Sequence, residues 1–222
     1  MTTRFVVTGC GRSGTGYISA LFEALGIRCG HEDVFNPWAE TNGGPISWPS
    51  DLNGEASWLA APHLASLPPG TVVFHQTRDP VQVVRSFVRI RFFEEPSEYL
   101  TYAESHIPRL ARGSLLERSV RYWVEWNEMA AVAGQHHDLR YRQHRLEDLD
   151  AALVVEMLGE LGVESSTHEV QKAIEATPRD TNTRGTKHDD HLVQLKDVAD
   201  AQLRDALIAA SAAYGYSLGR IG

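Results

Sequence analysis

A glycine-rich turn near the N-terminus carries the residues best suited to hold an anion. The segment Gly9-Cys10-Gly11-Arg12-Ser13-Gly14-Thr15-Gly16-Tyr17 follows an apolar run that begins at Phe5, and it precedes a helical pattern. A strand, a tight turn and a helix N-terminus direct several backbone N–H groups and the positive end of a helix dipole to one point. Gly9 and Gly14 have P-loop spacing, but the P-loop lysine is missing and Arg12 supplies the cation. The turn is therefore expected to hold a phosphate or sulfate group without being an ordinary ATP-hydrolysing loop.

A second junction between a strand and a helix carries another arginine and a serine. The apolar run Val72–Thr77 leads to Arg78, Asp79 and Pro80. Asp79 is a favourable N-cap and Pro80 suits the first helical position. Ser86 then falls about two turns into the predicted helix, on the face of its N-cap. One guanidinium and one hydroxyl are expected to converge there on a second anion.

Together these two motifs resemble those of the sulfotransferases that use 3′-phosphoadenosine 5′-phosphosulfate (PAPS). Within that family, the motifs are most similar to those of the bacterial and tyrosylprotein-type enzymes. In that family the first loop binds the 5′-phosphosulfate, while the arginine and the serine eight residues later bind the 3′-phosphate. The strong resemblance covers residues 5–87, and Arg145–Leu149 is similar to the Tyr-Glu-Asp-Leu segment of many sulfotransferases. PAPS is the implied co-substrate and 3′,5′-adenosine bisphosphate (PAP) the product. The implied nucleotide-binding residues in the two motifs are Gly11, Arg12, Ser13, Gly14, Thr15, Gly16, Tyr17, Arg78 and Ser86.

The resemblance also implies roles for single residues of the loop. Arg12 and the loop N–H groups would neutralise the charge that develops on the leaving 5′-phosphate. Thr15 and Gly16 would hold the same phosphate, and Ser13 would contact the bridging region. The alternative interpretation leaves Arg12 as a surface arginine on a tight turn and Arg78 in a salt bridge at a strand end.

The candidate general base follows the second predicted strand, in the segment Cys29-Gly30-His31-Glu32. A similar Cys-Gly-Glu segment in tyrosylprotein sulfotransferases, and a glutamate in some bacterial carbohydrate sulfotransferases, supplies the catalytic base. Glu32 is therefore the first choice and His31 the second. A histidine titrates in the neutral range unaided, whereas a glutamate needs its pKa raised. The alternative is that Glu32 pairs with a nearby arginine and orders the loop.

Two motifs of the cytosolic animal enzymes are missing or altered. The Lys-Thr-His acceptor motif is absent, and the C-terminal Arg-Lys-Gly segment has a partial counterpart only in Thr183–Lys187, from which Arg184 is assigned to cover the nucleotide. His188–His191 offers metal-ligand types, but four consecutive polar residues do not converge on an ion without help, so a solvated turn is favoured. No Walker-B aspartate follows an apolar strand, and no metal is expected.

The elements that must position these residues alternate between strands and helices. Strands are expected from residue 5 and at 27–30, 72–77 and 139–146. Helices are expected at 14–25, 56–67, from 80, over 96–134 with breaks near Pro108 and Gly113, and at 148–161, 167–176 and 200–213. Loops are expected at 33–54 and 177–196. This alternation predicts one α/β domain over residues 1–222, a P-loop-like three-layer fold with a central parallel sheet flanked by helices and a helical middle segment. Its ligands should bind at the carboxyl ends of the strands.

Composition narrows the partners and the compartment. The formal net charge of −8 argues against a nucleic-acid or anionic-membrane partner. No apolar run approaches the ~20 residues of a membrane helix, and no signal peptide is recognised, so the cytoplasm is expected. Cys10 and Cys29 imply no disulfide framework. Cys10 is more often a small filler than a reactive thiol in such a place, and His75 within an apolar strand is expected to be a packed histidine.

The reaction expected is transfer of a sulfuryl group from PAPS to a hydroxyl or amine of a small-molecule, carbohydrate or glycolipid acceptor, by in-line displacement with a general base. Acceptor identity and oligomeric state stay open. The alternatives are a P-loop kinase that uses ATP and a nucleotide-binding module without chemistry. Aromatic residues can stack on an acceptor, although core packing explains each of them equally well. The aromatic candidates are Trp38, Trp48, Trp58, Phe92, Phe93 and Tyr99.

Overall fold

A five-stranded parallel sheet forms the centre of the computed structural model, which describes residues 3–37, 48–178 and 195–218. Its strands lie in the order β2-β3-β1-β4-β5, and every adjacent pair is parallel. The strands are β1 (Phe5–Thr8), β2 (Cys29–Gly30), β3 (Gly54–Ala56), β4 (Val72–Thr77) and β5 (Arg140–Arg145). The predicted parallel α/β architecture is therefore confirmed.

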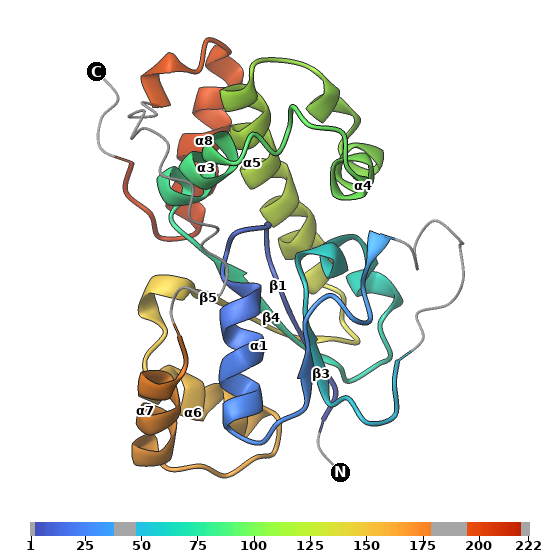
Figure 1. Ribbon diagram of the computed structural model, residues 1–222, viewed down its shortest axis with the longest axis vertical. Coiled ribbons are helices and arrows are strands. Elements are labelled where there is room, and N and C mark those ends of the chain that lie inside the picture. The colour runs from blue at the N-terminus through green and yellow to red at the C-terminus, as the bar shows by residue number, and fades with distance from the viewer. Residues whose placement is uncertain (1–2, 38–47, 179–194, 219–222) are drawn as a thin grey trace.

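Helices cover both faces of this sheet (Figure 1). One face carries α1 (Thr15–Ala24), α6 (Ala151–Glu160) and α7 (Thr167–Ala176). The other carries the 3₁₀ helix η1 (Trp58–Ser66) and the helices α3 (Pro80–Arg89), α5 (Leu115–Gly134) and α8 (Ala201–Ala213). The two buried clusters follow the pleat of β1, since Phe5 and Val7 pack with the first group and Val6 with the second.

The helical middle segment divides where proline and glycine predicted. Helix α4 (Glu98–His106) is followed by the 3₁₀ turn η2 (Pro108–Ala111), and Ser114 then opens α5 with a capping box to Glu117. Two further 3₁₀ turns are η3 (Leu146–Asp148) and η4 (Leu195–Asp197). Within the described ranges, no helix is long and apolar enough to cross a membrane.

Two expectations from the sequence were wrong in detail, and a third was confirmed in a tighter form. The loop predicted over residues 33–54 does not extend to its predicted end, since strand β3 begins at Gly54. The helix predicted over residues 56–67 is present as the 3₁₀ helix η1, and Pro62 inside it lacks the N–H group that an α-helix needs. The strand predicted over residues 27–30 is reduced to the two residues of β2.

Close packing explains why a glycine opens the missed strand. A Cβ atom on Gly54 would lie 2.1 Å from the ring of Phe5 in the neighbouring strand β1. Only a residue without a side chain lets β3 approach β1 in this register, in which Gly54 lies opposite Phe5. The same short strand then carries Glu55 into the core.

Candidate active site

A cleft of about 810 Å³ opens at the carboxyl ends of β1, β2 and β4. The structure brings most of the predicted site residues to its walls, although they come from three separate segments. Those from the glycine-rich turn and the start of α1 are Gly11, Arg12, Gly14, Thr15, Gly16 and Tyr17. Those from the other two segments are His31, Glu32 and Arg78.

Two of the predicted residues that the structure describes, Ser13 and Ser86, do not line this cleft. Ser13 is fully buried beneath the turn, so its hydroxyl is not presented to the cleft as the resemblance implied. Ser86 is also largely buried, but its Oγ accepts a hydrogen bond of 2.9 Å from Nε of Arg12. Arg184, like the aromatic candidate Trp38, lies outside the described residues.

Helix α5 holds the glycine-rich turn from one side. The Tyr122 hydroxyl accepts the backbone N–H of Gly11 at 2.9 Å. Oδ1 of Asn127 accepts the N–H of Cys10 at 3.2 Å. Both side chains are fully buried, so these bonds form in a low-dielectric setting where an unpaired N–H group is costly. Two consecutive peptide groups are thereby fixed by residues more than 100 positions away in the sequence.

Strand β4 and the residue after it hold the turn from the other side. Nε2 of Gln76 donates to the carbonyl oxygen of Ser13 at 2.8 Å. Nη1 of Arg78 donates to the carbonyl oxygen of Arg12 at 3.1 Å. The turn is thus preorganised through its main chain, and Arg78 joins the two predicted anion motifs directly.

The backbone of the turn is bent into the left-handed region. Arg12 has a φ of 68° and Gly14 a φ of 94°. A positive φ is uncommon for a residue with a side chain and is concentrated at functional sites. Helix α1 begins at Thr15, and its N-cap Gly14 provides no side-chain hydrogen bond to the first turn. The first turn of α1 therefore faces the cleft without a side-chain cap, which suits an anionic ligand.

A prediction for stability follows from the close approach of the turn to β4. A Cβ atom on Gly9 would lie 2.1 Å from the backbone oxygen of Gln76. Gly9→Ala should therefore lower the free energy of unfolding by about 1–3 kcal/mol, because main chain must shift to relieve the clash. Urea denaturation followed by circular dichroism measures this loss. Gly159→Ala in α6 is the matched control, since its new methyl group meets no atom within 4 Å. Equal stability of the two variants would contradict the account.

The candidate bases lie beside each other in the wall of the cleft. Nε2 of His31 is 3.9 Å from Oε1 of Glu32 and 3.3 Å from Oγ1 of Thr15. Glu32 has a φ of 63°, a second left-handed residue with a side chain at this site. Burial, then the charge of Glu32 and a hydrogen bond to it, raises the pKa of the Tyr99 hydroxyl. Glu32 therefore contacts both His31 and a tyrosine that borders the cleft.

The site contains supporting residues that motif reading did not find. Tyr122 and Asn127 lie in a helical segment with no motif around them, so no sequence signal marked them. Glu147 lies in the segment 145–149 already noted for its resemblance. Its Oε1 accepts the N–H of Asp79 at 2.9 Å, and its Oε2 accepts the hydroxyl proton of Tyr216 at 2.9 Å. Glu147 thus fixes the N-terminus of α3, which follows Arg78.

Two residues with reactive side chains are structural. Burial raises the pKa of the Cys10 thiol to about 12, so the thiol stays protonated. Burial lowers the pKa of His75 to about 4, and its neutral ring contacts the Tyr141 hydroxyl at 2.6 Å and Asn127 Oδ1 at 3.1 Å. Cys10 is the small filler and His75 the packed histidine that the sequence favoured.

The cleft has an aromatic half beside the candidate bases. Three of the aromatic candidates, Trp58, Phe92 and Tyr99, line it. Phe87 and Tyr122 contribute two further rings. Two others follow the core-packing alternative: Phe93 is fully buried in the core, and Trp48 packs on Phe35 and does not line the cleft. The cleft therefore has an aromatic wall, which three of the candidate residues share with Phe87 and Tyr122.

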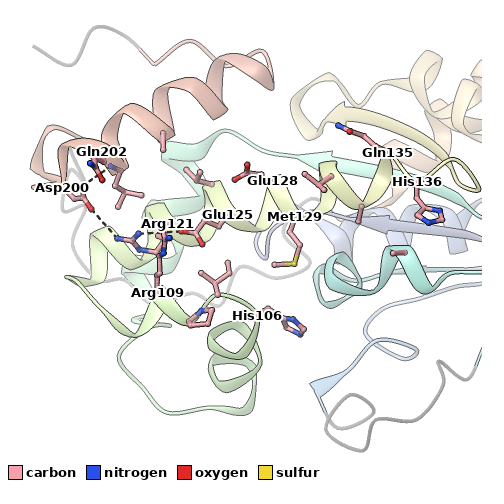
Figure 2. A pocket seen from close by; sticks show the side chains of 18 of the residues that line it. His106, Arg109, Arg121, Glu125, Glu128, Met129, Gln135, His136, Asp200 and Gln202 are labelled. Carbon is pink, nitrogen blue, oxygen red and sulfur yellow. Dashed lines mark hydrogen bonds and ion pairs between the residues drawn. The ribbon is translucent and has the colours of Figure 1, made fainter.

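A second hollow of about 1230 Å³ lies between α5, α8 and the segment around η2 (Figure 2). It is larger than the cleft but holds none of the predicted site residues. Three of its charged groups pair with one another, since Arg121 lies 3.6 Å from Asp200 and 3.8 Å from Glu125. The cleft at the strand ends is nevertheless the candidate active site, because the predicted polar groups converge there and not in the larger hollow.

Comparison with solved structures identifies the fold. No protein-family model and no curated protein matches the chain. The sulfotransferase domain from the curacin biosynthetic pathway shares 13% identity and has a TM-score of 0.57, over 99% of both chains. The sulfotransferase domain of a Synechococcus olefin synthase shares 14% identity (TM-score 0.46, 98% and 96% covered). Mouse sulfotransferase SULT7A1 complexed with PAP shares 11% (TM-score 0.45, 80% of this chain and 64% of that one). The first of these likenesses shows that this chain has the fold of a sulfotransferase domain.

Proposed function

We propose that this protein is a PAPS-dependent sulfotransferase that sulfates a hydroxyl or amine of a small-molecule, carbohydrate or glycolipid acceptor. One observation carries the proposal. A single cleft is lined by the glycine-rich turn with Arg12, by Arg78, and by Glu32 and His31. An anion site and a proton acceptor therefore share one space, which is the arrangement that sulfuryl transfer to a hydroxyl group requires.

The donor half of the cleft fits a nucleotide with two anionic ends. Helix α1 offers the N–H groups of its first turn and the Thr15 hydroxyl for the 5′-phosphosulfate. Arg12 bonds both Ser86 and Arg78, and we assign the 3′-phosphate to Arg78 and Ser86, which leaves Arg12 for the 5′-phosphate. A Cβ atom on Gly14 would lie 2.9 Å from Leu146, so glycine is needed where the main chain lines the cleft. Arg184 is proposed to cover the bound nucleotide.

The acceptor half supplies the base and an apolar surface. Glu32 removes the proton from the acceptor hydroxyl as the new S–O bond forms, with His31 as the alternative base. The S–O bond to the 5′-phosphate breaks at the same time, and Arg12 and the loop N–H groups stabilise the charge left there. Trp58, Phe92 and Tyr99 offer stacking surfaces, which favours an acceptor with a flat or apolar body.

Transfer of radiolabel from [³⁵S]PAPS to a panel of neutral phenols, simple sugars and glycolipids tests this proposal. We expect labelled sulfate ester to form with an equal amount of PAP, without added divalent cation. Absence of transfer to every acceptor, together with phosphorylation of a panel member from ATP and Mg²⁺, would replace the proposal with a kinase.

The assignment of Arg78 to the donor predicts a binding defect. Arg78→Ala should weaken binding of PAP by about 1.5–3 kcal/mol, the worth of a hydrogen bond to a charged group. Isothermal titration calorimetry measures the change. Arg85→Ala removes the same charge from an exposed position of α3 outside the cleft lining and serves as the control. Wild-type affinity in Arg78→Ala would show that the 3′-phosphate assignment is wrong.

A further inference from the structure

Strand β3 places a carboxyl group beneath the loop that carries the candidate base. Glu55 lies in the middle of β3, between β1 and β2, and is fully buried. Its Oε1 atom accepts the backbone N–H groups of Asp33 and Val34 at 2.7 and 3.1 Å. Asp33 directly follows Glu32, so one of these bonds fixes the peptide group on the C-terminal side of that left-handed residue.

The second oxygen of Glu55 faces another acid. A Cβ atom on Gly30 would lie 2.2 Å from Oε2 of Glu55 and 2.8 Å from Oδ2 of Asp33, so the two oxygens are separated by no more than the sum of these distances. Oε2 is buried with no hydrogen-bond partner among the described residues. Two carboxylates this close resist simultaneous ionisation. Burial, together with the charge of Asp33, raises the pKa of Glu55 to about 7.

We propose that Glu55 is a positioning residue for catalysis, whose carboxylate holds the loop 31–35 in the conformation that presents Glu32 to the cleft. The inference rests on the proposed function, since it assigns a role to Glu55 only through the base. A hydrogen bond to a carboxylate is roughly twice as strong as one to a neutral acceptor. The loop is therefore held firmly when Glu55 is ionised and loosely when it is protonated.

The direction of the pH effect follows from the groups around Glu55. Asp33 faces it from the loop and Cys29 from β2, while the residues of β1, Phe5–Thr8, carry no titratable side chain. Burial, and then the charge of Glu55, raises the pKa of the Cys29 thiol, so this group stays neutral. As the pH falls through about 7, Glu55 takes up a proton, the loop loosens and turnover declines.

NMR can test, without relying on activity, whether Glu55 holds the loop 31–35. The measured quantities are the amide chemical shifts of Asp33 and Val34 from pH 5 to 9. In the wild-type protein both shifts should titrate together with a midpoint near 7. Glu55→Gln keeps an acceptor oxygen but cannot ionise, so the titration should disappear. Glu23→Gln is the matched control, because Glu23 bonds the N–H of Cys29 at 2.8 Å from the partly exposed side of β2. It should leave the titration unchanged.

Asp33→Asn keeps the proposal testable if Glu55→Gln does not fold. Removing the charge of Asp33 should move the midpoint of the Val34 shift to lower pH. No titration in the wild type, or an unchanged midpoint in Asp33→Asn, would overturn the proposal.

Steady-state kinetics then test whether the hold of Glu55 on the loop 31–35 affects turnover. Glu55→Gln should lower kcat at pH 8 by about tenfold, the equivalent of about 1.4 kcal/mol for the lost charge-assisted bonds, with the KM for PAPS unchanged. Its kcat should no longer rise between pH 6 and 8. A pH profile of kcat that is identical in Glu55→Gln and wild type would reduce Glu55 to a structural residue. A wild-type protein that transfers no sulfuryl group would instead overturn the proposed function. The NMR titration would still decide whether Glu55 holds the loop 31–35.

Discussion

Glu32→Gln is expected to reduce kcat by about 10²- to 10⁴-fold, the range for loss of a general base. The amide keeps the size of the side chain and can still contact Tyr99 and His31, but it cannot accept the acceptor proton. Affinity for PAP should stay at the wild-type value, because the proposal assigns Glu32 to the acceptor and the two arginines of the cleft, Arg12 and Arg78, to the donor. Steady-state kinetics with saturating donor, combined with calorimetry, separate the two effects.

His31→Asn distinguishes the two candidate bases. Its ring lies 3.9 Å from Glu32 and 3.3 Å from the Thr15 hydroxyl, so it can support the base or replace it. If Glu32 is the base, His31→Asn should reduce kcat much less than Glu32→Gln does. Full turnover in Glu32→Gln with a large loss in His31→Asn would transfer the role to His31.

Arg12→Ala is expected to reduce kcat by about 10²- to 10³-fold, as removal of one preorganised group that stabilises developing charge does. The guanidinium of Arg12 bonds Ser86, and Arg12 lines the cleft. Arginine and alanine both carry a Cβ atom, so the substitution leaves the backbone strain at φ 68° unchanged. Arg85→Ala on the exposed side of α3 is the control and should retain wild-type turnover. Equal kcat in Arg12→Ala and Arg85→Ala would remove Arg12 from the catalytic group.

The strand–turn–helix units at the site could be predicted because their signals are local. Glycine spacing marked the turn at residues 9–14, and Asp79 with Pro80 marked the start of α3. Asp79 indeed accepts the N–H of Gln82 at 2.9 Å as an N-cap. Such signals depend on neighbours in the sequence and on backbone geometry, so they survive without any knowledge of tertiary contacts.

The remainder of the site depends on contacts that the sequence does not mark. Tyr122 and Asn127 reach the glycine-rich turn from a helix more than 100 residues away, and no local pattern distinguishes them from core residues. The three residues of β3 include a glycine and an acid and no β-branched side chain, so they do not resemble a strand. The buried position of Glu55 beside the loop 31–35 could not be predicted, because it depends on the placement of β3 between β1 and β2.

Calorimetric titration with PAP, beside ATP with and without Mg²⁺, tests the central claim most directly. The account predicts tight, metal-independent binding of PAP, weaker binding of ATP, and loss of PAP affinity in Arg78→Ala but not in Arg85→Ala. A preference for ATP with Mg²⁺ would contradict the claim and favour a kinase. Binding of neither nucleotide would show that the cleft at the strand ends is not a donor site.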